Sequence, residues 1–231
     1  PDFLYACGNY SDHHDAGETA HWPTFHASYV SYVRSLPNFQ KGPAAWTDKT
    51  KKLIAFLFGL SVHYVTDEMW EGLTKDLANG HGFVRFLAAE NEMHPGHSDD
   101  LESPANDAVD FYLSFASNLT GIKPWERYFP VEDLVNVYHI TPTIADPKKN
   151  YTDVTLESLK NCRVLFDLGL WAEKLFGQIL FPYYSSKIKQ LPLVAETVFD
   201  LPIGGLDYIS VRVQYAWDRI AQWLDVGQPV T

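Results

Sequence analysis

Residues 52–70, KLIAFLFGLSVHYVTDEMW, carry the most regular hydrophobic pattern in the chain. Apolar side chains recur here at spacings that place them on one face of an α-helix. This face comprises Leu53, Phe56, Leu57, Leu60, Tyr64 and Met69. Either Thr47 or Asp48, just before the stretch, can cap its first turn. The pattern therefore predicts a long amphipathic helix over residues 51–73, the best-defined element of the sequence.

Shorter helical patterns occur on both sides of this stretch. They predict helices over residues 22–35, 83–91, 104–119, 130–138, 156–180, 193–199 and 209–224. Residues 1–20, 37–46 and 141–150 are rich in turn-forming residues, so we expect loops there. No run of alternating β-branched residues predicts a sheet. The sequence thus predicts an all-α fold and a single domain over residues 1–231.

The composition suits a globular domain with a substantial core and argues against several kinds of partner. Hydrophobic residues make up 46% of the 231 residues, and aromatic residues 15%. The formal net charge is −11, so a basic face for a nucleic-acid backbone is not expected. No apolar run approaches the roughly 20 residues that span a bilayer. The chain opens at Pro1-Asp2 without a signal peptide, and we expect it to be a processed or truncated piece.

Two further features bear on the compartment of the protein. Asn9, Asn118 and Asn150 each begin an Asn-x-Ser/Thr triplet, the acceptor sequence for N-glycosylation. Together they predict a secreted, extracellular or luminal glycoprotein. The two cysteines, Cys7 and Cys162, fit either one long-range disulfide or two buried thiols on composition alone.

A candidate metal site lies within the long predicted helix. His63 and Asp67 are four residues apart, so on a helix the imidazole and the carboxylate lie one turn apart on the same face. This geometry provides two ligands for a divalent ion such as zinc. The pattern alone is weak, because a histidine that faces a core is more often structural.

Residues early in the chain strengthen this interpretation. His21 stands at a predicted helix start and Asp2 in a predicted loop, and together with the helical pair they would make four ligands. His13 and His14 compete for the same role. The alternative is that Asp2 is a turn residue and His21 a polar group at the helix start.

Six blocks of sequence follow one another in the order known from one family of enzymes. They are HWPTFHAS (21–28), KLIAFLFG (52–59), HYVTDEMW (63–70), GFVR (82–85), PYYSSK (182–187) and GGLD (204–207). Together they resemble the catalytic domain of glycosylphosphatidylinositol-specific phospholipase D over nearly the whole chain. That domain is similar to the zinc-dependent phospholipases C and the S1/P1 nucleases. The resemblance implies a helical phospholipase C/P1 nuclease-like domain that cleaves phosphodiesters with up to three zinc ions.

The resemblance also implies roles for particular residues. Asp2, His21, His63 and Asp67 would bind the first zinc ion, and Asp67 would bridge to a second. His63 and Asp67 are therefore the candidate catalytic residues. The cysteines of this chain fall where the family has cysteines, which implies a disulfide between Cys7 and Cys162.

The sequence departs from the family pattern at two of the three metal sites. It begins downstream of the amino-terminal ligands of the second zinc. At the third site a carboxylate replaces the expected histidine twice, and His94 and His97 are possible substitutes. This degenerate third site comprises Glu71, Glu102, Asn106 and Asp107. Carboxylates favour Ca2+ or Mg2+, so we expect one to two zinc ions and a changed third site.

The sequence thus leads to three functional hypotheses. The first is a metal-dependent hydrolase acting on phospholipid head groups or GPI anchors, with possible membrane-surface association. The second is a catalytically impaired domain that serves as a structural or interaction module, with further domains or assembly partners. The third is a single-strand nuclease of the S1/P1 type, which the acidic charge makes less favourable because no nucleic-acid partner is expected.

Overall fold

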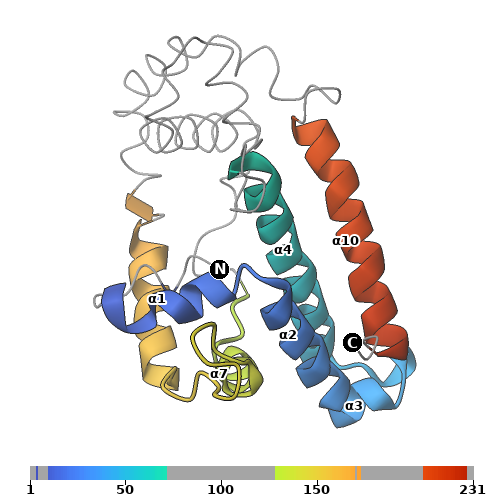
Figure 1. Cartoon of the computed structure of the whole chain (residues 1–231). Helices are drawn as coiled ribbons and strands as arrows, with labels where there is room; N and C mark the ends of the chain where they lie inside the picture. The colour runs from blue at the N-terminus through green and yellow to red at the C-terminus, as the bar shows by residue number, and fades with distance from the viewer. Residues whose placement is uncertain (1–3, 5–9, 72–127, 170, 173–204, 228–231) are drawn as a thin grey trace. The chain divides into compact units, whose positions relative to one another are not determined.

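The computed structural model describes residue 4 and residues 10–71, 128–169, 171–172 and 205–227 (Figure 1). These residues are helical or lie in turns and loops. The only strand-like feature among them is an isolated antiparallel bridge between Pro142 and Asn150. The prediction of an all-α fold is therefore confirmed. None of the described helices has the length and apolar character needed to cross a bilayer.

The described helices follow the predicted order, with two additional α-helices and a 3-10 turn within residues 1–20 and 37–46, where loops were predicted. They are α1 (Tyr10–Thr19), α2 (Pro23–Ser35), α3 (Pro37–Gln40), α4 (Asp48–Glu71), α7 (Val131–Ile140) and α10 (Leu206–Val226), with a 3-10 turn η2 (Pro43–Ala45) and helical residues at 156–169. The chain forms two compact units. The first consists of Pro1–Tyr64, Arg127–Gly169 and Tyr215–Thr231, and the second of Val65–Glu126 and Leu170–Gln214. The single domain over residues 1–231 stays a prediction.

Helix α4 matches the amphipathic pattern of its sequence. The hydroxyl of Thr47 accepts a hydrogen bond from the Thr50 N–H at 3.2 Å, which identifies Thr47 as the cap. Leu53, Leu57 and Leu60 are buried, as their spacing predicts. Helix formation and core burial therefore agree along α4.

Aromatic packing joins α2 to its neighbours in the first unit. The ring of Phe25 lies 4.8 Å from that of Tyr138 on α7. The ring of Tyr29 stacks on Phe56 of α4 at 6.3 Å. Offset and edge contacts of this kind add to the burial of apolar area. Helix α2 therefore lies at the centre of the core and holds α4 and α7 against it.

A buried carboxylate adds a polar connection among the same three helices. Asp133 of α7 accepts a hydrogen bond from the Tyr32 hydroxyl of α2 at 2.7 Å. It also forms an ion pair with Lys49 of α4 at 2.9 Å. Burial and the hydrogen bond to Asp133 raise the pKa of Tyr32 to about 12. The charge of Asp133 is therefore compensated where it is buried.

Arg34 joins α2 to the carboxyl end of α10. Its Nη1 atom donates to the backbone carbonyls of Trp223, Leu224 and Asp225 at 3.2, 2.6 and 2.9 Å. A cation here donates to carbonyls of the last helical turn, of which that of Trp223 also accepts the Gly227 N–H at 3.0 Å, and complements the helix dipole. Gly227 follows with a φ of +90°, as is common just beyond a helix end.

Helix α1 contradicts the sequence-based expectation of a loop over residues 1–20. Residues 10–19 are helical although their sequence, YSDHHDAGET, has little hydrophobic periodicity. Among the described side chains of this segment, the buried apolar and hydroxyl ones are small: Ala16 and Thr19, and Ala20 just after the helix. Small side chains let the backbone approach the core closely, and such packing stabilises a helix whose own propensity is low. The predicted helices over 83–91, 104–119 and 193–199 lie outside the described residues.

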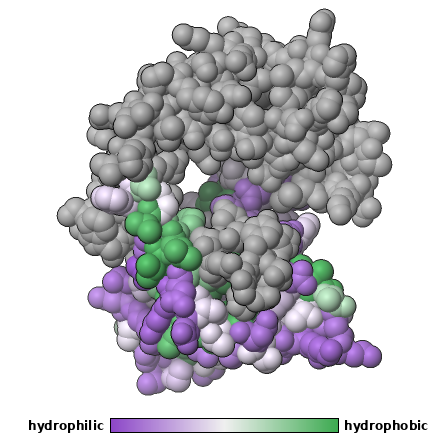
Figure 2. Space-filling model, turned by 90° about the vertical axis from the view of Figure 1, so that its left-hand side faces the viewer, coloured by the Kyte–Doolittle hydropathy of each residue, from purple (hydrophilic) through white to green (hydrophobic). Residues whose placement is uncertain are grey.

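Exposed apolar side chains gather on the face of the molecule shown in Figure 2. Residues 156–169, which lie within the predicted helix 156–180, carry exposed Val164, Leu165 and Leu168. Two of these are more than half exposed, at 64% for Val164 and 55% for Leu168. Association with a membrane surface stays a prediction.

Candidate metal centre

Three of the four predicted ligands of the first metal lie together. His21 stands in the turn between α1 and α2, and His63 and Asp67 follow one another by one turn on α4. One ligand atom from each lies within 4.8 Å of the others. His21 is buried and the other two are half-buried. The cluster is therefore compact and shielded from solvent on the His21 side.

Helix α1 fixes the orientation of the His21 ring. The Nδ1 atom lies 3.0 Å from the backbone oxygen of Gly17, in the last turns of α1. A carbonyl oxygen can only accept, so Nδ1 carries the proton and Nε2 keeps its lone pair. Metal-binding histidines commonly have such a second hydrogen bond, which sets the tautomer and the ring plane.

The distance between the two imidazoles agrees with zinc binding. Two nitrogens bound to one tetrahedral zinc at about 2.05 Å lie about 3.3 Å apart. The Nε2 atoms of His21 and His63 are 3.3 Å apart. The same distance also permits a long hydrogen bond in which the His63 ring donates to His21. With a carboxylate beside them, the two imidazoles form a donor set that fits zinc.

His26 of α2 is a second buried histidine near His21 in sequence, and the sequence pattern did not predict a role for it. His26 donates from Nδ1 to the backbone oxygen of Trp22 at 2.9 Å, and its ring lies 5.7 Å from that of Tyr64. Burial lowers the pKa of His26 to about 4, partly opposed by the hydrogen bond to Trp22. His26 therefore stays neutral beside the candidate metal centre at neutral pH. Its place in the block HWPTFHAS was the only sequence signal for it.

Comparison with curated proteins finds relatives of one kind. Phosphatidylinositol-glycan-specific phospholipase D of Dictyostelium discoideum is 26% identical over 225 residues, which are 97% of this chain and 21% of that protein. The Bos taurus protein of the same name is 31% identical over 201 residues, and the Homo sapiens protein 29% over 197, each covering 84% of this chain and 20% of the relative. The chain is similar to phosphatidylinositol-glycan-specific phospholipase D. The resemblance inferred from the sequence is thereby confirmed.

The similarity covers only part of each relative. The chain spans about a fifth of the length of these phospholipase D relatives. No protein-family model matches the chain. No solved structure matches it either. The activity of these full-length relatives is therefore a proposal for this chain.

The remaining predicted site residues are placed only in part. Glu71 is the last residue of α4. Asn150 is exposed in the loop after α7, and Cys162 is fully buried in the helical residues 156–169. The side chains of His13 and His14 and all of Asp2, Cys7, Asn9, His94, His97, Glu102, Asn106, Asp107 and Asn118 lie outside the described part of the chain. The disulfide, the glycosylation sites, the fourth ligand and the third metal site stay predictions.

Proposed function

We propose that this chain is a metal-dependent phosphodiester hydrolase domain that acts on phospholipid head groups, GPI anchors among them. The observation that supports it most is the convergence of His21, His63 and Asp67 within 4.8 Å. The name of the relatives adds the substrate class, a phosphatidylinositol glycan. The acidic charge and these relatives make a single-strand nuclease less favourable.

Some groups of the site would bind the metal, and others orient the side chains that bind it. His21 and His63 present Nε2 atoms, and Asp67 adds an anionic oxygen. The Gly17 carbonyl keeps His21 in the tautomer that can bind. A zinc ion held by these residues would supply positive charge to phosphoryl oxygens and would lower the pKa of a water towards about 7. No protein nucleophile is then needed, and Asp2 is the proposed fourth ligand.

A substrate panel tests the hydrolase proposal. The full chain is assayed on a GPI-anchored protein, a soluble phosphodiester and single-stranded DNA. We expect cleavage of the GPI-anchored protein that is lost in His63→Asn and kept in His139→Asn. His139 is a matched control because its Nε2 atom bonds to the Val154 carbonyl, away from the site. Cleavage of DNA alone, or equal activity in both variants, contradicts the proposal.

A catalytically impaired domain is the second candidate, supported by the substitutions at the third metal site. Glu71 and Glu102 stand where the resemblance implies imidazoles. Loss of one electrostatic stabiliser typically lowers a rate by about 10²–10³. We therefore expect Glu71→His with Glu102→His to raise the phosphodiesterase rate. An unmodified chain that already cleaves at rates typical of enzymes, with no gain in the double variant, excludes this candidate.

The proposed compartment is the extracellular or luminal space. It is supported by the acceptor triplets at Asn9, Asn118 and Asn150 and by the predicted disulfide between Cys7 and Cys162. The side chain of Asn150 is on the surface, as a glycan requires. Mass spectrometry of protein secreted from eukaryotic cells, before and after glycosidase treatment, checks this assignment.

A further inference from the structure

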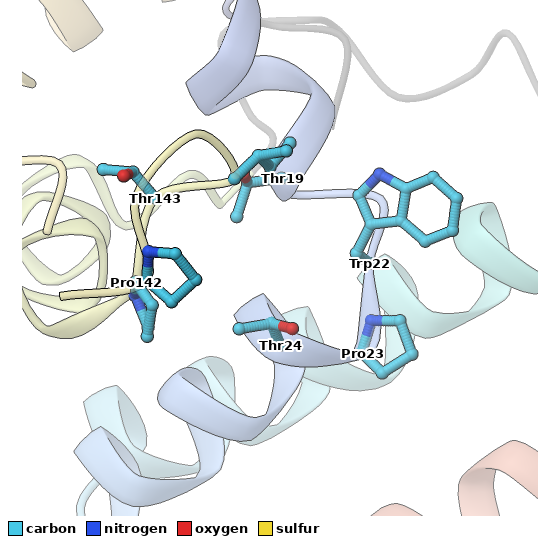
Figure 3. Close-up of a pocket in the computed structure, with 8 residues that line it drawn as sticks. Thr19, Trp22, Pro23, Thr24, Pro142 and Thr143 are labelled. Atoms are coloured by element: carbon cyan, nitrogen blue, oxygen red, sulfur yellow. The ribbon is translucent and has the colours of Figure 1, made fainter. Parts of the chain in front are cut away.

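A cavity of about 530 Å³ lies in the first unit (Figure 3). One wall is the turn at residues 19–24, and the other is the loop at residues 142–147. The metal-binding His21 lies within the first of these segments, directly before Trp22. The volume falls within the range of about 300–1,000 Å³ that is common for small-molecule sites. The candidate metal centre does not use this cavity.

The two walls are held together by a single buried hydroxyl. The Tyr151 hydroxyl accepts a hydrogen bond from the Ile144 N–H at 3.1 Å and donates to the Asp15 carbonyl at 3.1 Å. It also forms a hydrogen bond with the Thr19 hydroxyl. The indole of Trp22 is fixed in turn, because its Nε1–H donates to Glu18 at 3.1 Å. The cavity is therefore built before any ligand arrives, which reduces the entropic cost of binding.

The lining specifies the chemical class of the ligand. The lining residues are Trp22, three prolines, three threonines and Ile144, and none of them carries a charged side chain. A phosphate or another anion would find no cationic partner among these side chains. An acyl chain would stay partly in water, because Ile144 at the cavity is 53% exposed. A neutral ring with apolar faces and many hydroxyls matches both the rings and the threonines.

We propose that this cavity binds a sugar ring, and that it receives the neutral glycan of the substrate while the phosphodiester lies at the metal centre. The assignment of the sugar to a substrate rests on the proposed function, whereas sugar binding itself does not. The position of Trp22 next to His21 places the two sites on the same turn. Binding there would raise affinity without taking part in the chemical step.

Mannotriose binding to the full chain, followed by ligand-observed NMR, tests the sugar site. We expect saturation transfer to mannotriose that disappears in Trp22→Ala and in Thr24→Tyr. Thr24 is exposed at the cavity, so a tyrosine there fills the space without disturbing the core. Binding should persist in His63→Asn and in Trp217→Ala, which removes a tryptophan that packs on Phe58 instead. No binding to the wild type, or binding of 1-octanol with no binding of mannotriose, overturns the proposal.

Kinetics separate this proposal from the proposed function. On a GPI-anchored protein, Thr24→Tyr and Trp22→Ala should raise KM about tenfold with kcat little changed. On a soluble phosphodiester without a glycan, both variants should match the wild type. Mannotriose binding without any hydrolysis would refute the proposed hydrolase activity but would leave the proposed sugar site intact. Hydrolysis with an unchanged KM in both variants would refute the assignment of the glycan to this cavity.

Discussion

Replacement of Asp133 by asparagine should destabilise the first unit by about 2 kcal/mol. The carboxylate is 4% exposed and receives both the Tyr32 hydroxyl at 2.7 Å and the Lys49 ammonium at 2.9 Å. An amide keeps the shape and the oxygen but removes the charge. The Tyr32 hydrogen bond then loses about 1 kcal/mol, the difference between a charged and a neutral bond. The Lys49 pair adds about 0.5 kcal/mol, because that side chain is 58% exposed.

The position of Asp133 in α7 accounts for the rest of the predicted destabilisation. Asp133 lies in the first turn of α7, where a negative charge complements the helix dipole by about 0.5 kcal/mol. Urea unfolding followed by circular dichroism measures the total. Lys49→Met should cost less than about 1 kcal/mol. A double variant, Tyr32→Phe with Asp133→Asn, should cost less than the sum of the single changes, because one bond is removed twice.

Two results would refute this reasoning. One is an Asp133→Asn variant as stable as the wild type, which would mean that the charge does not contribute where it is buried. The other is strict additivity of the Tyr32 and Asp133 changes, which would mean that the bond between α2 and α7 has no energetic weight. Either result would remove the polar connection among the three helices from the account.

Two further predictions concern stability, and a third concerns the pairing of the cysteines. Arg34→Met should lower the free energy of unfolding by about 2 kcal/mol, because the Leu224 and Asp225 carbonyls at the end of α10 lose the Arg34 donor, whereas the Trp223 carbonyl keeps the Gly227 N–H; unfolding curves of the variant and the wild type check this, and equal midpoints contradict it. The pKa of His26 is lowered to about 4 in the folded chain, so its contribution to stability is complete above pH 6.5 and is lost as the pH falls towards 4. Between pH 7 and pH 4.5 the loss should be about 2.5 kcal/mol, and it should be smaller in His26→Gln when both proteins are unfolded at the two pH values; an identical pH dependence in the two proteins contradicts it. Thiol labelling of denatured, unreduced protein should find no free cysteine, since Cys7 and Cys162 are predicted to be joined; two labelled thiols would show that they are not.

The helices that carry a strong periodic pattern were predicted well from sequence. The pattern over residues 51–73 gave the position of α4 to within a few residues, because a buried apolar face leaves a direct trace in the sequence. The same holds for α2, α7 and α10. Helix α1 was missed for the opposite reason. Its described buried side chains, such as Ala16 and Thr19, are small, and packing of this kind leaves no apolar pattern in the local sequence.

The candidate site was predictable where the ligands share a helix and less so elsewhere. Residues four apart on α4 had to lie on one face, so His63 and Asp67 followed from spacing alone. His21 was a candidate from its place at a predicted helix start, the family resemblance implied the same role, and the structure brings it to the same point. The role of the Gly17 carbonyl could not be predicted, because every residue has a backbone oxygen and only the fold decides which one meets Nδ1. The cavity beside Trp22 likewise depends on a loop more than a hundred residues away.

The metal content of the purified chain tests the central claim most directly. Elemental analysis after gel filtration should find at least one zinc ion per chain in the wild type and in His139→Asn. His21→Asn, His63→Asn and Asp67→Asn should each lose most of that zinc, since each removes one of the three converging ligand atoms. A wild-type chain without zinc or another transition metal would contradict the account, as would a His63→Asn variant that keeps the full amount.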